Sequence, residues 1–265
     1  MNLFFDTILA AGYKSGAQIT RVLSESWATG NMYCPCCGHS TLTKLDNNQP
    51  VADMYCEKCE EIFELKSTKG KIGRKIMDGA YETMIQRINS LSNPELLVLQ
   101  YTPEYEIMNL TFIPKFFFVP SIIEKRKPLP PTARRHGWVG CNILYSNIPK
   151  QGKIPVIQNK IVVDKEIVVG KYTTVKEIQT NNIETRGWLF DVLNCVNNIC
   201  SDTFTLKEMY RFVDMLQEHH QDNHNIEAKI RQQLQLLRDK GFIEFLGGGV
   251  YRKKYKTEIH CRLIP

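Results

Sequence analysis

The sequence has no apolar run long enough to cross a membrane. A membrane-spanning helix needs about 20 consecutive apolar residues, and the longest apolar stretches here, at 96–101 and 116–120, have the length of strands. The N-terminus also lacks the basic segment that precedes the apolar core of a signal peptide, and it contains Asp6. We therefore expect a soluble, cytoplasmic protein with no membrane partner.

Compositional extremes are absent as well. Hydrophobic residues make up 43% and charged residues 23% of the 265 positions, which is close to a globular average and excludes disordered, collagen-like and coiled-coil chains. The length suits about two domains. Lys and Arg number 34 against 28 Asp and Glu, a net charge of +6. This excess is compatible with an anionic partner, although an ordinary solvated basic surface gives the same number.

A secreted disulfide framework is also excluded, because the nine cysteines are odd in number and unevenly spaced. Five of them fall in one short segment. Pairing Cys34 with Cys37 leaves 18 residues before Cys56 and Cys59, which is the C-x2-C spacing of a four-thiolate zinc site. Cys36 is the rival ligand, but it lies too near Cys34 for the usual turn. Four thiolates leave no position for water, so the zinc would be structural; a set of buried free thiols is the alternative.

Hydrophobic periodicity predicts a mixed α/β core up to about residue 175. Helices are expected over 15–28 and 75–89, and strands over 51–55, 61–67, 96–101, 107–113, 138–144, 154–157 and 161–163. Strands interleaved with helices in this way favour an α/β fold.

The pattern changes near residue 183. Three helix-like segments, 187–199, 206–218 and 226–240, precede a glycine-turned hairpin over 242–255. Three helices and a hairpin predict a winged helix, so we expect a first domain over 1–182 and a second over 183–265. A core stripe on the third helix is formed by Ile226, Ile230, Leu234 and Leu237.

The winged helix offers polar and basic side chains for base edges or phosphates. The candidate DNA contacts here are Asn225, Lys229, Arg231, Gln232, Arg252, Lys253 and Lys254. A scaffold or dimerisation helix with an ordinary polar face is the alternative.

Two carboxylates and a lysine surround the second cysteine pair. Glu64 and Lys66 lie two apart on a predicted strand and therefore point the same way, whereas Leu65 points into the core. Asp53 and Glu64 offer the hard oxygen ligands that Mg²⁺ prefers, and Lys66 would stabilise charge or orient the nucleophile. Such a triplet also occurs by chance. Here Cys56 and Cys59 of the zinc site lie between Asp53 and Glu64 in the sequence, so a bound zinc ion would align the two carboxylates. The pattern therefore favours metal-assisted phosphodiester hydrolysis.

Seven strings in this order resemble the Dam-replacing, DpnI-like family of restriction endonucleases over nearly the whole chain. They are CPCCG, QPVADMYC, EKCEEIFELKS, DGAY, KPLPPTARRHGWVGCNI, RGW and KIRQQLQLLRDK. The resemblance implies a mixed-sheet PD-(D/E)xK nuclease core with a four-cysteine zinc knuckle, fused to a winged helix. It implies a type II, methyl-directed, Mg²⁺-dependent enzyme that cuts double-stranded DNA at GATC sites carrying N6-methyladenine.

The same resemblance implies roles for residues of this chain. Asp53, Glu64 and Lys66 match the family's catalytic positions, and Asp53, Glu64 and the Leu65 main-chain carbonyl would hold Mg²⁺. The four cysteines Cys34, Cys37, Cys56 and Cys59 match its zinc ligands. A monomer in the bacterial cytoplasm that requires no protein partner is expected.

A methyl group on adenine adds an apolar projection in the major groove, for which an aromatic face is a natural partner. Trp138, beside a basic loop, is the candidate, with a core tryptophan as the alternative. Arg134 and Arg135 would contact guanine or, more commonly, phosphate.

Two other functions stay open at the level of sequence. One is a zinc-containing winged-helix DNA-binding regulator without nuclease activity, whose Asp53 would be dispensable. The other is a nuclease of the same fold that acts on junctions or on unmethylated DNA and ignores adenine methylation.

Overall fold

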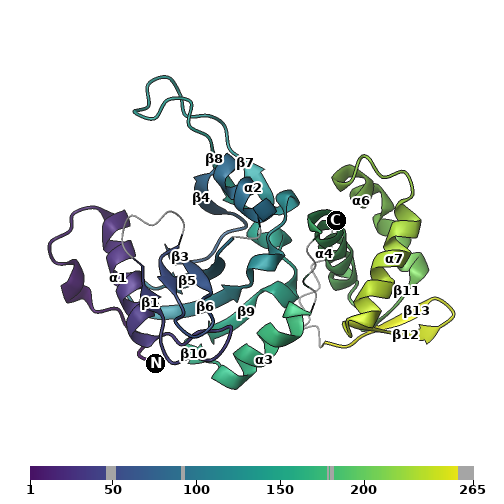
Figure 1. Cartoon of the computed structure of the whole chain (residues 1–265), viewed down its shortest axis with the longest axis horizontal. Coiled ribbons are helices and arrows are strands. Elements are labelled where there is room, and N and C mark those ends of the chain that lie inside the picture. Colours follow the sequence, from purple (N-terminus) through teal and green to yellow (C-terminus); the bar gives the residue numbers. More distant parts are fainter. Residues whose placement is uncertain (46–51, 91–92, 178, 180–181, 256–265) are drawn as a thin grey trace.

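A computed structural model describes residues 1–45, 52–90, 93–177, 179 and 182–255. Figure 1 shows an α/β part that carries the N-terminus and a smaller, mostly helical part that follows it in the chain. The predicted mixed α/β core and C-terminal helix-and-hairpin unit are both present. No helix among the described residues is long and apolar enough to cross a membrane.

The core of the first part is a seven-stranded mixed sheet of order β1-β2-β3-β5-β6-β9-β10. Its strands are β1 (Thr43–Lys44), β2 (Met54–Tyr55), β3 (Ile62–Lys69), β5 (Glu95–Tyr101), β6 (Ile107–Ile113), β9 (Ile154–Gln158) and β10 (Ile161–Val162). β3 and β5 run parallel, and the other neighbours are antiparallel. A parallel pair needs a crossover, and residues 70–94 provide it. Of the predicted strand over 51–55, only Met54 and Tyr55 are in a strand; Ala52 and Asp53 are not, and Val51 lies outside the described residues.

The crossover contains the clearest error of the sequence-based prediction. Residues predicted as the first part of a helix form β4 (Ile76–Ala80), and α2 (Tyr81–Ser90) begins only afterwards. β4 joins β8 (Gly140–Ile143) and β7 (Ile123–Lys125) in a second sheet of order β4-β8-β7. Residues 76–80 form a strand because they pair with a strand more than 40 residues away in the sequence, and such pairing cannot be predicted from local helix propensity.

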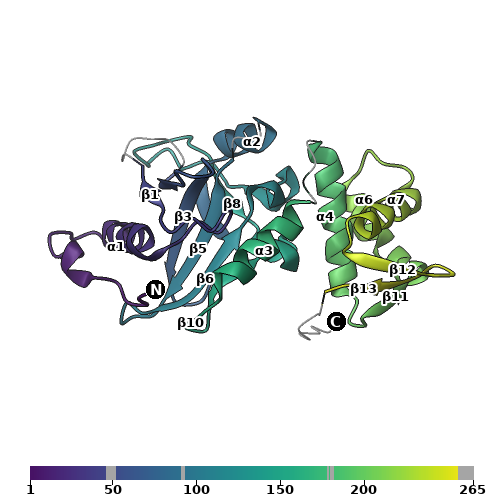
Figure 2. The same cartoon turned by 60° about the horizontal axis from the view of Figure 1, so that its bottom comes forward.

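Helices α1 (Gly16–Asn31) and α3 (Lys165–Lys176) pack against the large sheet, α1 on β3 and α3 on β9 (Figure 2). α1 was predicted and buries Leu23 and Trp27. α3 was not predicted, because it is rich in β-branched residues of low helix propensity and buries only Val168, Tyr172 and Val175. Short 3-10 turns are η1 (Thr7–Ala10), η2 (Lys115–Phe117), η3 (Pro120–Ile122), η4 (Tyr145–Asn147) and η5 (Lys150–Gly152).

The C-terminal part is a winged helix. It consists of α4 (Ile183–Asn198), β11 (Thr203–Thr205), α5 (Leu206–Met209), η6 (Tyr210–Phe212), α6 (Val213–His219), α7 (Ile226–Asp239), β12 (Ile243–Gly247) and β13 (Val250–Lys253). The segment predicted as one helix over 206–218 is therefore interrupted at η6. Thr205 caps α5 in a capping box with Glu208. Ile226, Ile230 and Leu234 are at most 4% exposed, which confirms the predicted core stripe of α7.

Helix α4 connects the two parts. Its residues from Arg186 to Val196 are buried on nearly all faces, with the exception of Asn194, as expected for a helix packed on two sides. The ring of Phe190 stacks on Phe117 of the first part with centroids 4.7 Å apart. Asn197 and Gln151 exchange two amide hydrogen bonds of 3.0 and 3.1 Å, and the Tyr255 hydroxyl donates to Asn197 Oδ1 at 3.0 Å. We call these last three residues the junction clasp.

Candidate active site

Four cysteine thiols form one cluster at the edge of the large sheet. The ligand atoms of Cys34, Cys37, Cys56 and Cys59 all lie within 4.8 Å of one another. The Sγ atoms of Cys34 and Cys59, and those of Cys37 and Cys56, are 3.6 Å apart. A tetrahedral zinc with Zn–S bonds of about 2.3 Å requires sulfurs about 3.8 Å apart, so the cluster has the dimensions of a structural zinc site. Cys36 is outside the cluster, as predicted.

Two matching turns bring the sulfurs together. The Gly38 amide donates to the Cys34 carbonyl at 2.8 Å, and the Glu60 amide donates to the Cys56 carbonyl at 2.8 Å. Each turn ends on a residue in the left-handed region, Gly38 with φ 75° and Glu60 with φ 60°. Glycine adopts this conformation freely, whereas glutamate is strained there. The second turn therefore depends more than the first on the contacts that hold its cysteines, Cys56 and Cys59, in place.

The thiols fit a cation electrostatically as well. Hydrogen bonding from Cys36 lowers the pKa of Cys34 to about 5, whereas burial raises the pKa of Cys37 and of Cys59. Four thiolates at this spacing repel one another unless a cation lies between them. The donor set is therefore suited to a bound metal ion rather than to four free thiols.

Asp53 is fixed beside the same hairpin. Its amide donates to the Phe63 carbonyl at 2.8 Å, which continues the pairing of β2 with β3. Its carboxylate Oδ2 accepts from the Leu65 amide at 2.7 Å. Burial raises the pKa of Asp53, while this hydrogen bond opposes the shift. The predicted inward orientation of Leu65 holds only in part, because its side chain is half-buried and borders a cleft.

Glu64 and Lys66 lie on the same side of β3, as predicted. Lys66 Nζ is 2.6 Å from a carboxylate oxygen of Glu64. Burial is the main cause that raises the pKa of Glu64 to about 7; Lys66 opposes this shift, and the neighbouring Asp78 and Asp53 add to it. Burial alone would lower the pKa of Lys66, but the two carboxylates around it raise the pKa above its ordinary value. A pair with such perturbed proton affinities is typical of functional sites.

Two more carboxylates belong to this group and were missed from the sequence. Asp78 on β4 accepts from Lys66 Nζ at 2.6 Å, with a side chain only 5% exposed. Its second oxygen, Oδ2, is buried and has no hydrogen-bond partner among the described residues. Glu25 on α1 is bound by Arg21 at 2.9 Å and by Lys44 at 3.0 Å. Asp78 begins the DGAY string, but no spacing in the sequence links it or Glu25 to Glu64 and Lys66, so only the fold brings both carboxylates to the site.

Most of these groups line one open cleft. A cavity of about 720 Å³ lies between α1, β3 and the start of β4, and it is bordered by Glu25, Asp53, Glu64 and Lys66. Lys75 and Arg21 add positive charge to its wall. The cleft therefore combines a cluster of hard oxygen donors with cations, an arrangement that can hold a divalent metal ion beside a phosphate group.

Trp138 lies half-buried at the base of the basic loop between β7 and β8. The guanidinium of Arg135 is 4.7 Å from the centroid of its ring, and both Arg134 and Arg135 are exposed. A Cβ atom on Gly140 would lie 2.8 Å from the Trp138 ring, so glycine is required there for the ring to occupy its position. Trp138 is thus neither a core residue nor a free surface residue, and its role in methyl recognition stays a prediction.

In the winged helix, the candidate DNA contacts differ in how accessible they are. Asn225, Arg231, Gln232 and Arg252 are exposed. Arg231 donates to the Tyr210 hydroxyl at 2.6 Å, and Lys229 Nζ lies 5.7 Å from the centroid of the Trp188 ring.

Of the three candidate DNA contacts on the return strand of the hairpin, Lys253 does not face solvent. Lys253 is 6% exposed and donates to the Ile199 carbonyl at 2.5 Å. Alternation along the strand turns Lys253 inward when Arg252 faces out. Lys254 is exposed but borders a pocket at the junction of the two parts.

Comparison with known protein families agrees with this architecture. A sequence model described as the Dam-replacing family matches residues 1–181, and one described as the Dam-replacing HTH domain matches residues 184–253. The first match alone covers more than half of the chain, and the second falls on the winged helix. The chain with the thiol cluster, the carboxylate cleft and the C-terminal helix-turn-helix unit belongs to the Dam-replacing family.

Proposed function

We propose that this chain is a type II restriction endonuclease with a PD-(D/E)xK core that hydrolyses double-stranded DNA at GATC sites carrying N6-methyladenine. The observation that carries the proposal is the convergence of Asp53, Glu64 and Lys66 in one cleft beside the thiol cluster, in a chain of the Dam-replacing family. The division into a nuclease domain over 1–182 and a DNA-binding domain over 183–265, a monomeric state and a bacterial cytoplasmic location belong to the same proposal.

Asp53, Glu64 and the Leu65 main-chain carbonyl are the proposed ligands of Mg²⁺. When bound, this ion polarises the phosphate and lowers the pKa of a coordinated water. Oxygen ligands suit it. The pKa of Glu64 is raised to about 7, mainly by burial and further by the neighbouring Asp78 and Asp53, and a divalent cation beside these carboxylates would favour their charged forms. The hydrogen bond from the Leu65 amide orients Asp53 toward the same cleft.

Lys66 is the proposed residue that stabilises negative charge on the reacting phosphate. Its ammonium is held between Glu64 and Asp78, each 2.6 Å away. Asp78 would fix the position of Lys66 if Glu64 turned to a metal ion. The cysteines of the thiol cluster, when they hold Zn²⁺, would pin the β2–β3 hairpin and keep Asp53 opposite Glu64.

Recognition of the substrate is proposed to involve both parts. The exposed basic loop with Arg134, Arg135 and Trp138 would read the site in the first part, with the Trp138 ring against the methyl group. The exposed residues Asn225, Arg231 and Gln232 of α7 and Arg252 of the hairpin would contact bases or phosphates in the second.

The test uses one plasmid prepared from adenine-methylating and from non-methylating hosts. Purified protein is incubated with each, with and without Mg²⁺. We expect discrete fragments at GATC spacing only from the methylated plasmid and only with Mg²⁺. Asp53→Asn should abolish cutting, and Glu104→Gln, an exposed carboxylate in a remote turn, should not affect it.

The same experiment separates the alternatives. Binding without cutting in either preparation would replace the nuclease by a DNA-binding regulator. Equal cutting of both plasmids would retain the catalytic triplet but remove the methyl recognition assigned to Trp138.

A further inference from the structure

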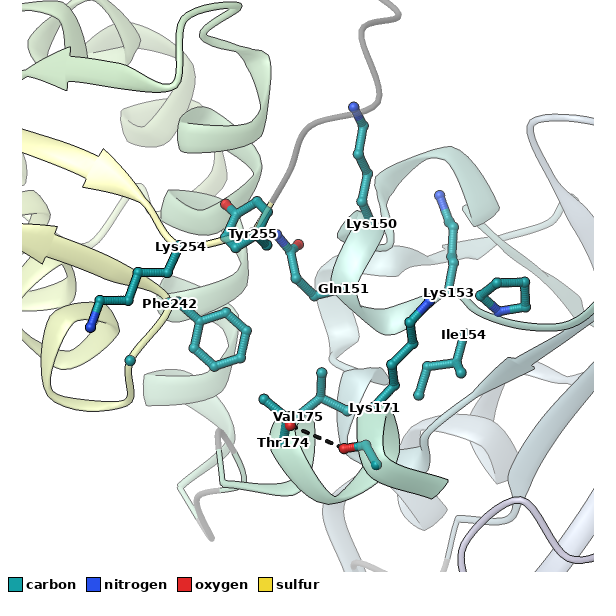
Figure 3. A pocket seen from close by; sticks show the side chains of 13 residues that line it. Lys150, Gln151, Lys153, Ile154, Lys171, Thr174, Val175, Phe242, Lys254 and Tyr255 are labelled. Atoms are coloured by element: carbon teal, nitrogen blue, oxygen red, sulfur yellow. Dashed lines mark hydrogen bonds between the residues drawn. The ribbon is translucent and has the colours of Figure 1, made fainter. Parts of the chain in front are cut away.

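A second cavity lies at the junction of the two parts, on a different set of elements from the carboxylate cleft. It has a volume of about 590 Å³, within the range of about 300–1,000 Å³ typical of small-molecule sites. Figure 3 shows Phe242 and Tyr255 of the winged helix on one side and Lys153, Ile154 and Lys171 of the first part on the other.

The wall of this junction pocket is positively charged. Lys150, Lys153, Lys171 and Lys254 all line it, and none of its described lining residues is an aspartate or a glutamate. Lys150 also acts electrostatically on Lys253, whose pKa is lowered by burial and by Lys150 and raised by Asp202. Figure 3 shows Lys150, Lys153 and Lys171 together on the side of the first part, whereas the Lys254 side chain leads away from the pocket. The three lysines of the first part create a potential that attracts an anion.

Lys153 is the least exposed of these cations. Its side chain is half-buried, and the ammonium lies 4.6 Å from the centroid of the Tyr145 ring. Burial, and to a smaller extent the nearby Lys150, lower the pKa of Lys153 to about 8. An anion bound beside such a desolvated ammonium would stabilise its charged form.

The rest of the pocket is apolar or aromatic. Phe242 and Tyr255 form an edge-to-face pair with centroids 6.4 Å apart, opposite Ile154 and Val175. The Thr174 hydroxyl is already bonded to the Gly170 carbonyl at 3.0 Å. An inorganic ion would leave this apolar surface uncovered, whereas a planar ring attached to the anion would cover it.

We propose that the junction pocket binds a nucleotide, with its phosphate on the lysines and its base against Phe242 and Tyr255. The nucleotide is either a free monophosphate or one unit of a single DNA strand, since both present the same phosphate and base. Gln151 and Tyr255 of the junction clasp line the pocket. The bound nucleotide therefore contacts both parts and favours the arrangement in which they are clasped. This site is independent of the proposed nuclease activity.

The experiment measures binding to the full-length protein by calorimetry, without Mg²⁺. The probes are dAMP, inorganic phosphate, adenosine and a single-stranded hexanucleotide without GATC. We expect dAMP or the hexanucleotide to bind, and phosphate and adenosine each to bind about tenfold or more weakly, because each supplies only half of the contacts. Binding of dAMP would identify the free nucleotide as the source, and binding of the hexanucleotide alone would identify the strand.

Variants locate the site. Lys150→Glu and Lys171→Glu change exposed residues, so both proteins should fold, and each should weaken binding about tenfold or more by reversing a charge at the phosphate. Lys14→Glu makes the same charge change at an exposed position in the N-terminal part and should leave binding unaltered. Absence of binding by both nucleotide probes would overturn the proposal. So would equal losses in all three variants, which would indicate a general charge effect.

Discussion

At the scale of single residues, the proposed role of Asp78 in positioning Lys66 can be tested directly. Its side chain is 5% exposed and holds Lys66 at 2.6 Å. Asp78→Asn removes the charge but keeps the shape. We expect kcat to fall by about 10- to 100-fold, in line with the effect of losing a supporting group, with little change in KM. The pH profile should shift toward lower pH, because the pKa of Lys66 falls when a carboxylate is lost.

The matched control is Glu82→Gln, a 72% exposed carboxylate on the adjacent helix α2. It should retain wild-type kcat and pH profile. If Asp78 had a purely structural role, Asp78→Asn would instead lower the melting temperature and leave kcat per folded molecule unchanged.

A second residue-scale prediction concerns stability and pH. Asp191 in α4 accepts from His219 at 3.4 Å and from His220 at 2.9 Å. Burial alone would raise the pKa of Asp191, but hydrogen bonding to the two histidines lowers it below its ordinary value. Hydrogen bonding to Asp191 raises the pKa of His219. The contribution of Asp191 to the free energy of unfolding is lost as the pH falls through the lowered pKa of Asp191. The contribution of His219 is lost as the pH rises through the raised pKa of His219.

The pair should therefore stabilise the winged helix most at mildly acidic pH. Asp191→Asn should reduce the free energy of unfolding by about 1 kcal/mol near pH 6, since His219 is partly exposed, and by less near pH 8. Urea unfolding at both pH values measures this difference. A loss that is the same at both would show that the charge of His219 does not contribute.

At the scale of elements, the β2–β3 hairpin depends on the thiol cluster. Cys56→Ser removes a buried ligand, and we expect the zinc content to fall from about one ion per chain to none. Asp53 and Glu64 flank this hairpin, so cutting of methylated DNA should be lost with the metal.

Cys36→Ser provides the comparison, because Cys36 is in the same loop but outside the cluster. It should keep its zinc and its activity. Equal zinc contents in the two variants, measured by elemental analysis, would contradict the assignment of the ligands.

At the scale of the whole molecule, the junction clasp couples the two parts. Asn197 bonds to both Gln151 and Tyr255. Asn197→Ala leaves these two groups without their partner and should destabilise the junction by about 1–3 kcal/mol. We expect thermal unfolding to separate into two transitions. Asn198→Ala, a neighbouring asparagine in the same helix, is the control. A single unshifted transition would show that the Phe117–Phe190 stack is sufficient.

Spacing within a single segment was enough to predict several features of the fold and of the site. The C-x2-C pairs identify the four clustered thiols because a turn places two sulfurs together wherever it occurs. Strand alternation places Glu64 and Lys66 on one side, and the apolar stripe of Ile226 and Ile230 identifies the buried face of α7.

Other features depend on partners that are distant in the chain, and these could be recognised only in the folded molecule. β4 is a strand because β8 pairs with it, and this pairing brings Asp78 to Lys66. Lys253 can stay on the inward side of its strand because the Ile199 carbonyl accepts a hydrogen bond from its ammonium. The junction pocket exists only because α3 and β9 face the hairpin of the winged helix. Such contacts cannot be predicted from local propensity, because their stabilising free energy arises only when separate segments pack together.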